Sequence, residues 1–216
     1  MTEINSSFHR PHRTEVYRRW ADSVEADFRF AVKLPKHITH ERRLIGAGVA
    51  LLRFAEQIVG LGDRLRVVLI QLPPSLVFEP GMAADFLGAA RAAFPAQLVL
   101  EPRHASWFSD ATETLLIEHA VARVAADPPP VPEASVPGGW RGFSYFRLHG
   151  APRIYRSDYG ASAIAGHARS VLRVAETSET WVIYDNTASG AATGNALALD
   201  DRLRKQRAAV SGCGDY

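Results

Sequence analysis

Short apolar runs alternate with longer amphipathic stretches along almost the whole sequence. The apolar runs are nearly continuous and do not alternate with polar residues. This pattern is typical of strands in a parallel sheet that is buried on both faces. We therefore expect strands at 28–34, 66–72, 97–103, 121–127, 143–150 and 181–186, and a further short strand at the very start of the chain.

The amphipathic stretches predict helices at 14–23, 49–60, 82–94, 112–120, 162–175 and 195–206. Because strand and helix alternate throughout, the expected fold class is α/β with a parallel sheet. The Pro- and Gly-rich segment 127–142 lies between two predicted strands, and we interpret it as a long loop within one domain. The expected organisation is a single domain over 1–216 that ends in a flexible tail at 208–216.

Composition limits the classes of function. A formal net charge of +2 is too small to indicate a dedicated nucleic-acid binder. The single cysteine, Cys213, excludes an internal disulfide framework and fits a reducing compartment. The chain starts without the apolar segment of a signal peptide, and it has no apolar run near the roughly 18 residues of a membrane span. We therefore expect a cytoplasmic protein with no membrane partner.

Polar side chains stand at the end of nearly every predicted strand. In parallel α/β folds the carboxyl ends of the strands share one side, where ligand sites form. A single polar residue at a strand end is common because loops are solvated. Their recurrence nonetheless favours a real site, built from Lys33, Gln71, Glu101, Arg103, Asp127, Arg147, His149, Asp185 and Asn186.

Several of these strand ends carry motifs of a known family. The segments "TEINSSFHRP" (2–11), "LEPRHASWF" (100–108), "YFRLHGAP" (145–152) and "VIYDNTASGAATGNAL" (182–197) are similar, in the same order, to segments of the YecE-like family, also called domain of unknown function family 72. The resemblance covers almost the whole chain. It implies a TIM-barrel-like (β/α) barrel with parallel strands alternating with helices, and it implies no assigned reaction.

The chain differs from the family pattern in two places. Members of that family begin with another βα unit, which carries a "GTSGW"-like segment ahead of the strand that contains "EINS". We therefore expect an N-terminally truncated barrel that lacks its first βα unit, as a shortened variant or through an incomplete gene model. The second difference is His9, which stands where the family has Tyr after Phe.

Acid and base chemistry is the first candidate for the strand ends. The carboxylates Glu101, Asp127 and Asp185 are suited to act as general acid and base, and His149 is the histidine best placed at a strand end to transfer a proton. These four are the candidate catalytic residues. The alternative is structural, with Glu101 forming an ion pair that stabilises the strand ends.

Anion binding is the second candidate. Arginine side chains bind phosphate and carboxylate in bidentate fashion, and aromatic side chains stack on sugars or bases. The candidate substrate-binding residues are Lys33, Gln71, Arg103, His104, Trp107, Arg147, Tyr155 and Asn186. For Trp107, packing against the following helix is the alternative. The small residues at 187–195 either let backbone N–H groups approach an anion or form a loop with Asn195 as an ordinary helix N-cap.

No cofactor is predicted. His40, His104 and His149, together with the strand-end carboxylates, offer donor atoms for a divalent metal, but the sequence has no tight ligand spacing such as HExxH. We therefore assign no metal ligand.

These observations predict an enzyme, either a hydrolase, a lyase or an isomerase, that uses acid/base chemistry on a small anionic substrate, phosphorylated or sugar-containing. One alternative is a nucleic-acid-binding or nuclease-like protein that uses the same basic groups. Another is a non-catalytic truncated barrel. The sequence leaves the substrate and the oligomeric state open.

Overall fold

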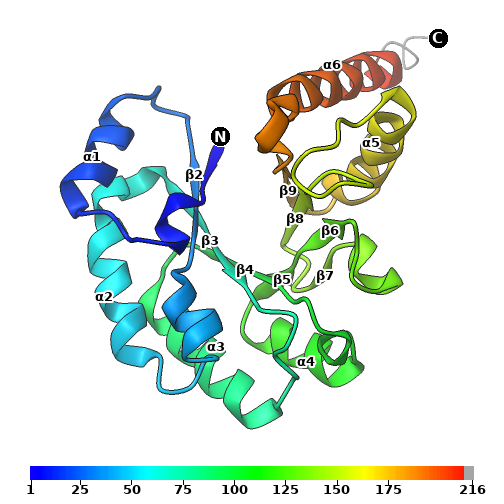
Figure 1. Ribbon diagram of the computed structural model, residues 1–216. Helices are drawn as coiled ribbons and strands as arrows, with labels where there is room; N and C mark the ends of the chain where they lie inside the picture. The colour runs from blue at the N-terminus through cyan, green and yellow to red at the C-terminus, as the bar shows by residue number, and fades with distance from the viewer. Residues whose placement is uncertain (212–216) are drawn as a thin grey trace. The chain divides into compact units, whose positions relative to one another are not determined.

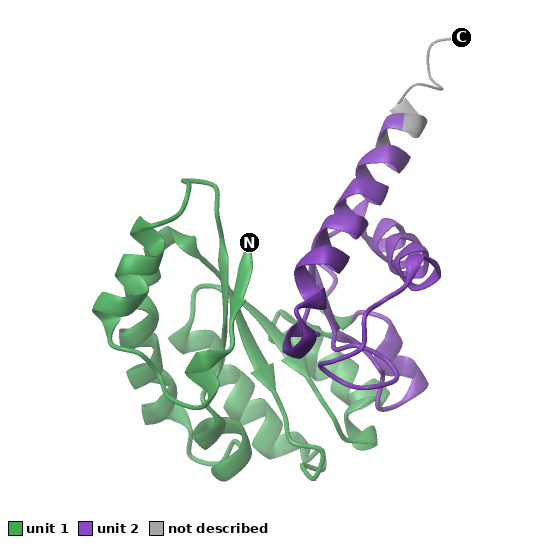
Figure 2. Cartoon of the chain, turned by 45° about the horizontal axis from the view of Figure 1, so that its top comes forward, with its two compact units in different colours: residues 1–124, 138–140 green, residues 125–137, 141–216 purple. Residues whose placement is uncertain are grey.

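The structure of the protein is a computed structural model that describes residues 1–211 (Figure 1). The chain forms two compact units, coloured separately in Figure 2. The first unit contains residues 1–124 and 138–140, and the second contains 125–137 and the described residues from 141 onward. Each unit has its own sheet, and each is described by itself. The expected single domain stays a prediction.

The sheet of the first unit is parallel except at one edge. Its strands follow the order β1 (Thr2–Ile4), β2 (Phe30–Lys33), β3 (Leu65–Gln71), β4 (Gln97–Glu101), β5 (Val121–Arg123) and β7 (Gly138–Gly139). Neighbours from β1 to β5 pair in parallel, and β7 pairs antiparallel with β5. The predicted parallel α/β class is therefore confirmed.

Four helices cover one face of this sheet: α1 (Thr14–Asp22), α2 (Gly48–Ile58), α3 (Pro80–Ala93) and α4 (Asp110–Glu118) (Figure 1). Short helical turns lie at Ser6–Phe8, His37–Glu41, Val59–Arg64 and Ala105–Trp107. Helix α3 starts on a strong local signal, because the Glu79 carboxylate accepts two backbone N–H groups and Pro80 follows it. The predicted helices thus form close to their expected limits.

The two faces of the first sheet differ in what they contact. Val32, Val68 and Leu98 point toward the helices and belong to the core cluster. Side chains alternate along a strand, so Lys33, Gln71 and Glu101 point to the opposite face. Gln71 and Glu101 are direct partners in the register of β3 and β4. Polar strand ends are therefore gathered on the face that the helices do not cover.

Gly60 allows α1 to approach the end of α2. A Cβ atom at this position would lie within contact distance of the backbone of α1, 2.3 Å from the carbonyl oxygen of Thr14. Helix α2 ends at Ile58, and the helical turn Val59–Arg64 follows it. The sequence predicted that Gly60 ends this helix. The structure shows in addition that a side chain at this position would clash with the backbone of α1, so glycine is needed there.

The second unit has a smaller parallel sheet of the order β6 (Ala125–Asp127), β8 (Phe143–Leu148) and β9 (Glu179–Tyr184). Helices α5 (Ala161–Ala175) and α6 (Ala191–Ser211) pack on it through two apolar clusters. Short helical turns lie at Pro132–Ser135 and Thr187–Ser189. Phe146, Leu148 and Tyr184 face the helices, and Arg147 therefore faces the other way.

Three sequence-based expectations need correction. The run 121–127, expected as one strand, forms two strands, β5 and β6. Val124 separates them in the sequence, and they belong to different sheets. The expected loop 127–142 contains strand β7, which pairs with β5. Helix α6 continues to Ser211, so the expected tail at 208–216 is helical over its first residues, and 212–216 lie outside the described residues.

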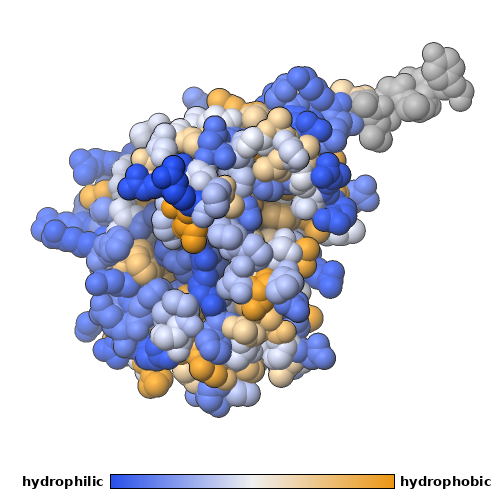
Figure 3. Space-filling view, turned by 45° about the vertical axis from the view of Figure 1, so that its right-hand side comes forward, coloured by the Kyte–Doolittle hydropathy of each residue, from blue (hydrophilic) through white to orange (hydrophobic). Residues whose placement is uncertain are grey.

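The face seen in Figure 3 shows hydrophobic residues dispersed among hydrophilic ones. Singly exposed apolar residues are normal for a globular protein and need no special explanation. Among residues 1–211, no helix combines the length and the apolar character that crossing a bilayer requires.

Candidate functional site

Three predicted site residues meet at the strand ends of the second unit. A single carboxylate oxygen, Asp185 Oδ2, lies 2.9 Å from the Arg147 guanidinium and 3.1 Å from His149 Nδ1. Arg147 is near the end of β8, His149 follows that strand, and Asp185 follows β9. The parallel pairing of β8 with β9 brings these positions side by side.

Burial strengthens the contacts of this group. The side chains of Arg147 and His149 are almost fully buried, and that of Asp185 is 13% exposed. A carboxylate is an acceptor only, so His149 Nδ1 carries the proton that it donates to Asp185. In a neutral imidazole the other nitrogen, Nε2, is then the basic one. Asp185 thus selects the tautomer of His149 and fixes the plane of its ring.

The segment after β8 packs against His149. The Tyr155 ring meets the imidazole edge-on, with 5.6 Å between centroids, and its backbone N–H donates to the His149 carbonyl oxygen at 2.5 Å. Tyr155 itself is 44% exposed. Gly150 makes this path possible, because its φ is +91° and a Cβ there would lie 2.9 Å from the carbonyl oxygen of Ser157. Tyr155, one of the predicted binding residues, therefore contacts the buried His149 and is also exposed to solvent.

Asn186 connects two segments of the second unit by hydrogen bonds. It is fully buried, and its Nδ2 donates to the Ser157 carbonyl oxygen and to Asn195 Oδ1, at 2.9 and 2.7 Å. Asn195 in turn donates to Asp158 at 2.7 Å. The interpretation of Asn195 as an N-cap is wrong, because α6 starts at Ala191 and Asn195 lies inside the helix. These two amides join the segment after β8 to α6.

Asp127 does not join the other predicted catalytic residues of its unit. It pairs in register with Leu148, which pairs with Tyr184, and both of these side chains face the helices. The Asp127 carboxylate accordingly lies toward α5, 4.0 Å from His167 Nε2. Asp127 and Asp185 thus both lie at the carboxyl ends of their strands but on opposite faces of the sheet. The reason is that side chains one position apart on a strand point to opposite faces.

Burial favours the neutral form of His167. Burial lowers its pKa below the ordinary value of 6.5, and the Asp127 carboxylate acts in the opposite direction to a smaller extent. The hydroxyl of Tyr184 contacts Nδ1 at 3.0 Å, and the Tyr159 ring packs edge-on at 4.8 Å. Burial also raises the pKa of both tyrosines. At neutral pH the group therefore contains an uncharged histidine beside one carboxylate.

We expect the free energy of unfolding to decrease as the pH falls below about 6.5. The unfolded chain binds a proton at His167 near that pH, whereas the folded chain binds it only at lower pH. Proton binding therefore favours the unfolded state within this window. Urea unfolding at about pH 7.5 and about pH 5.5 checks this, with His167→Gln as the comparison. An equal loss of stability in the wild type and the variant would contradict it.

The first unit holds the other predicted polar residues. Glu101 forms an ion pair with Arg103, in which the carboxylate is 1% exposed and the guanidinium 18%. Gln71 is the register partner of Glu101 on the next strand. The Lys33 ammonium lies over the Phe8 ring, 4.1 Å from its centroid, in a cation–π contact. The structural alternative for Glu101, an ion pair with Arg103, is thus observed.

His104 and Trp107 have local structural contacts. His104 Nδ1 accepts the backbone N–H of Ser106 at 3.2 Å and caps the turn that follows β4. Trp107 is 1% exposed, donates its indole N–H to the Leu76 carbonyl oxygen at 2.9 Å and packs edge-on against Phe78. The indole ring is thus enclosed almost completely by protein atoms. The substrate-stacking interpretation of Trp107 is therefore corrected to the packing alternative.

No three His, Cys, Asp or Glu side chains within residues 1–211 gather in a way that would hold a metal ion. His40, one of the imidazoles considered as a ligand, contacts the Thr39 hydroxyl at 2.8 Å and the Phe8 ring. Burial, followed by the nearby Lys33 ammonium, lowers the pKa of His40.

Comparison with known proteins identifies the family of this chain and solved structures with a similar fold. The sequence matches the model of a family described as "Protein of unknown function DUF72" over residues 1–213. The chain belongs to the DUF72 family. The family resemblance of the strand-end motifs is thereby confirmed. No protein with a curated description matches the sequence.

Solved structures of DUF72 proteins have a similar fold. A DUF72 protein from Thermotoga maritima MSB8 aligns with a TM-score of 0.77 and 25% sequence identity, covering 94% of this chain and 83% of that chain. A DUF72 protein from Enterococcus faecalis V583 aligns with a TM-score of 0.80 and 22% identity, covering 94% and 84%. The second likeness shows the fold alone.

Sequence reasoning missed the surroundings of Asp127. His167 and Tyr184 were not singled out, although each lies in a predicted helix or strand of this DUF72 chain. A histidine on a helix carries no sequence signal that names its partner. Only the packing of α5 on the sheet brings His167 to Asp127 and Tyr184.

Proposed function

We propose that this DUF72 protein is an enzyme that uses acid/base chemistry on a small anionic substrate. His149 is the proposed group that transfers a proton, and Asp185 positions it. Arg147 shares the same carboxylate oxygen. Lys33, Gln71, Glu101 and Arg103 form a separate set of proposed binding and acid/base groups within the first unit.

The contact of His149 Nδ1 with Asp185 is the observation that carries this proposal. A carboxylate that accepts the Nδ1 proton leaves Nε2 as the basic atom and stabilises the imidazolium that forms when a proton is taken up. Arg147 limits that stabilisation, because it donates to the same oxygen and so spreads the carboxylate charge over two donors. This balance suits a histidine that must both take and return a proton.

The charges of the first unit support an anionic substrate. Lys33 and Arg103 are cationic and Glu101 is anionic, so the strand ends that carry these residues have one positive charge in excess. Lysine and arginine both bind phosphate and carboxylate groups. The +2 net charge of the whole chain gives no specific support to the nucleic-acid alternative. The closure of the sheets into a barrel stays a prediction.

The test is an activity screen followed by substitution. The substrates are p-nitrophenyl phosphate, bis(p-nitrophenyl) phosphate and p-nitrophenyl glycosides, which report phosphoester and glycoside cleavage by one colour change. For any activity found, we expect His149→Gln to lower kcat/KM by about 100-fold or more, since general acid/base groups contribute that much. Glu101→Gln is expected to lower it as well.

The matched control is His119→Gln, the same substitution at the end of α4 and outside the proposed site. It is expected to keep the wild-type kcat/KM. Circular dichroism of all variants separates loss of chemistry from loss of fold. Wild-type activity in folded His149→Gln would rule out proton transfer by His149.

A further inference from the structure

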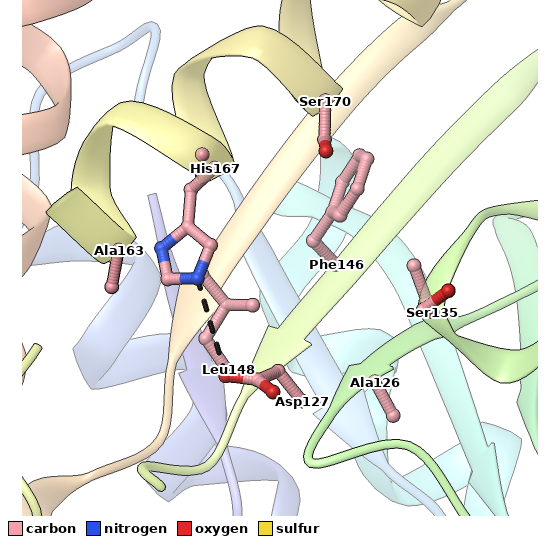
Figure 4. Close-up of a pocket in the computed structure, with 10 residues that line it drawn as sticks. Ala126, Asp127, Ser135, Phe146, Leu148, Ala163, His167 and Ser170 are labelled. Carbon is pink, nitrogen blue, oxygen red and sulfur yellow. Dashed lines mark ion pairs between the residues drawn. The ribbon is translucent and has the colours of Figure 1, made fainter. Parts of the chain in front are cut away.

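A pocket of about 310 Å³ lies on the helix-facing side of the smaller sheet, between β6, β8 and α5. Its walls are mostly apolar and include Phe146, Leu148 and Ala163 (Figure 4). The charged end holds the Asp127 carboxylate and the His167 imidazole, which face each other. Ser135 and Ser170 line other parts of the wall. Arg147, by contrast, points to the other face of the same sheet, so this pocket is separate from the proposed proton-transfer site.

The contacts of His167 decide which of its nitrogens carries the proton. Tyr184 is 7% exposed, and its hydroxyl contacts Nδ1 of His167 at 3.0 Å. A buried hydroxyl that did not donate its proton would leave a donor unsatisfied, at a cost of about 1–3 kcal/mol. Tyr184 therefore donates to Nδ1, and the proton of the neutral imidazole is on Nε2. The pocket thus presents an N–H donor from His167 beside a carboxylate acceptor from Asp127.

The gap between donor and acceptor is too long for a direct hydrogen bond. His167 Nε2 and Asp127 Oδ2 are 4.0 Å apart. An oxygen atom could lie about 2.9 Å from Nε2 and about 2.7 Å from Oδ2. The angle Nε2···O···Oδ2 at that oxygen would then be about 90°. A hydroxyl group satisfies both contacts, because it accepts from Nε2–H and donates to the carboxylate. The geometry therefore matches one bridging O–H group, which either water or a ligand hydroxyl supplies.

We propose that this pocket binds a small molecule with a hydroxyl group on an apolar body, and that the hydroxyl bridges His167 and Asp127. The apolar body lies against Phe146 and Leu148. The volume is at the lower end of the range for small-molecule sites, which limits the ligand to a single ring or a short chain.

Charge and hydrogen bonding exclude the competing ligand classes. The Asp127 carboxylate repels an anion, and the residues that line the pocket include no lysine or arginine. An ammonium group has donors but no acceptor, so it would leave Nε2–H of His167 unsatisfied. This inference is therefore independent of the anionic substrate proposed above, and failure of either leaves the other standing.

The test compares three compounds of nearly equal shape: benzyl alcohol, toluene and benzylamine. Binding to the full chain is measured by the shift of protein NMR signals on titration. We expect benzyl alcohol to bind with a dissociation constant of about 1 mM, the range of a ligand with so few atoms. Toluene, which lacks the hydroxyl, and benzylamine, which lacks the acceptor, are each expected to bind about tenfold more weakly.

Two variants locate the site. Asp127→Asn keeps the shape but removes the charge, so we expect about tenfold weaker binding of benzyl alcohol and little change for toluene. Ala163→Leu fills the pocket from α5 and is expected to abolish binding of all three compounds. Asp200→Asn removes the same charge from an exposed position on α6 and is the control without effect.

Three results would overturn the proposal. They are an absence of saturable binding of benzyl alcohol to the wild type, stronger binding of benzylamine than of benzyl alcohol, and unchanged benzyl alcohol affinity in folded Asp127→Asn. The second of these would identify a cation site.

Discussion

Replacing Asp185 by Asn is expected to lower the free energy of unfolding by about 3–5 kcal/mol. The carboxylate holds the Arg147 guanidinium and the His149 imidazole, and both of these side chains are almost fully buried. Asparagine keeps the size but loses the negative charge, so the guanidinium loses its ionic contact with this oxygen inside the protein. Removing one partner of a buried ion pair costs more than the pair contributed, because the remaining charge is desolvated. Urea unfolding at neutral pH measures the loss.

The control for this prediction is Asp200→Asn. Asp200 pairs with Arg204 one helical turn away, and both side chains are more than half exposed. A solvated pair of this kind contributes at most about 0.5 kcal/mol. Similar losses in the two variants would contradict the buried character of the Arg147–Asp185–His149 group.

Replacing Trp107 by Ala is expected to cost about 3–5 kcal/mol of unfolding free energy. The indole is 1% exposed, packs against Phe78 and donates to the Leu76 carbonyl oxygen. Truncation leaves a large cavity, and the buried carbonyl oxygen of Leu76 loses the N–H group that donates to it. Thermal and urea unfolding report the change directly.

Trp107→Phe separates the two contributions. It keeps most of the apolar contact and removes the N–H donor, so we expect a smaller loss of about 1–3 kcal/mol. If Trp107→Ala remained as stable as the wild type and only ligand binding weakened, the tryptophan would have the binding role that the sequence first suggested.

The α/β class and the strand ends were predictable from the sequence because both depend on local pattern. Continuous apolar runs indicate parallel strands, and a strand ends where the run meets polar residues. Glu101 and Asp185 were placed this way, and each lies at or just beyond the end of its strand. The family followed from motifs at the same positions.

Local structure was harder to predict where two signals compete. The run 121–127 is apolar throughout, and nothing in its composition marks Val124 as the point between two sheets. Asn195 is a common N-cap residue, but α6 begins at Ala191 and uses Asn195 to bind the segment after β8. Tertiary hydrogen bonds thus overrode the local preference.

The sequence by itself determined that strands and helices alternate, that the strands run parallel and that their ends are polar, since these properties follow from residue type and spacing along the chain. Only the tertiary structure decided which polar residues meet. Asp127 and Asp185 both follow apolar runs, yet Asp127 lies beside His167 and Asp185 beside Arg147 and His149. The physical reason is that a strand buried on both faces has no polar alternation to mark its two sides. The side that a carboxylate occupies is then set by register and by the helix that packs there.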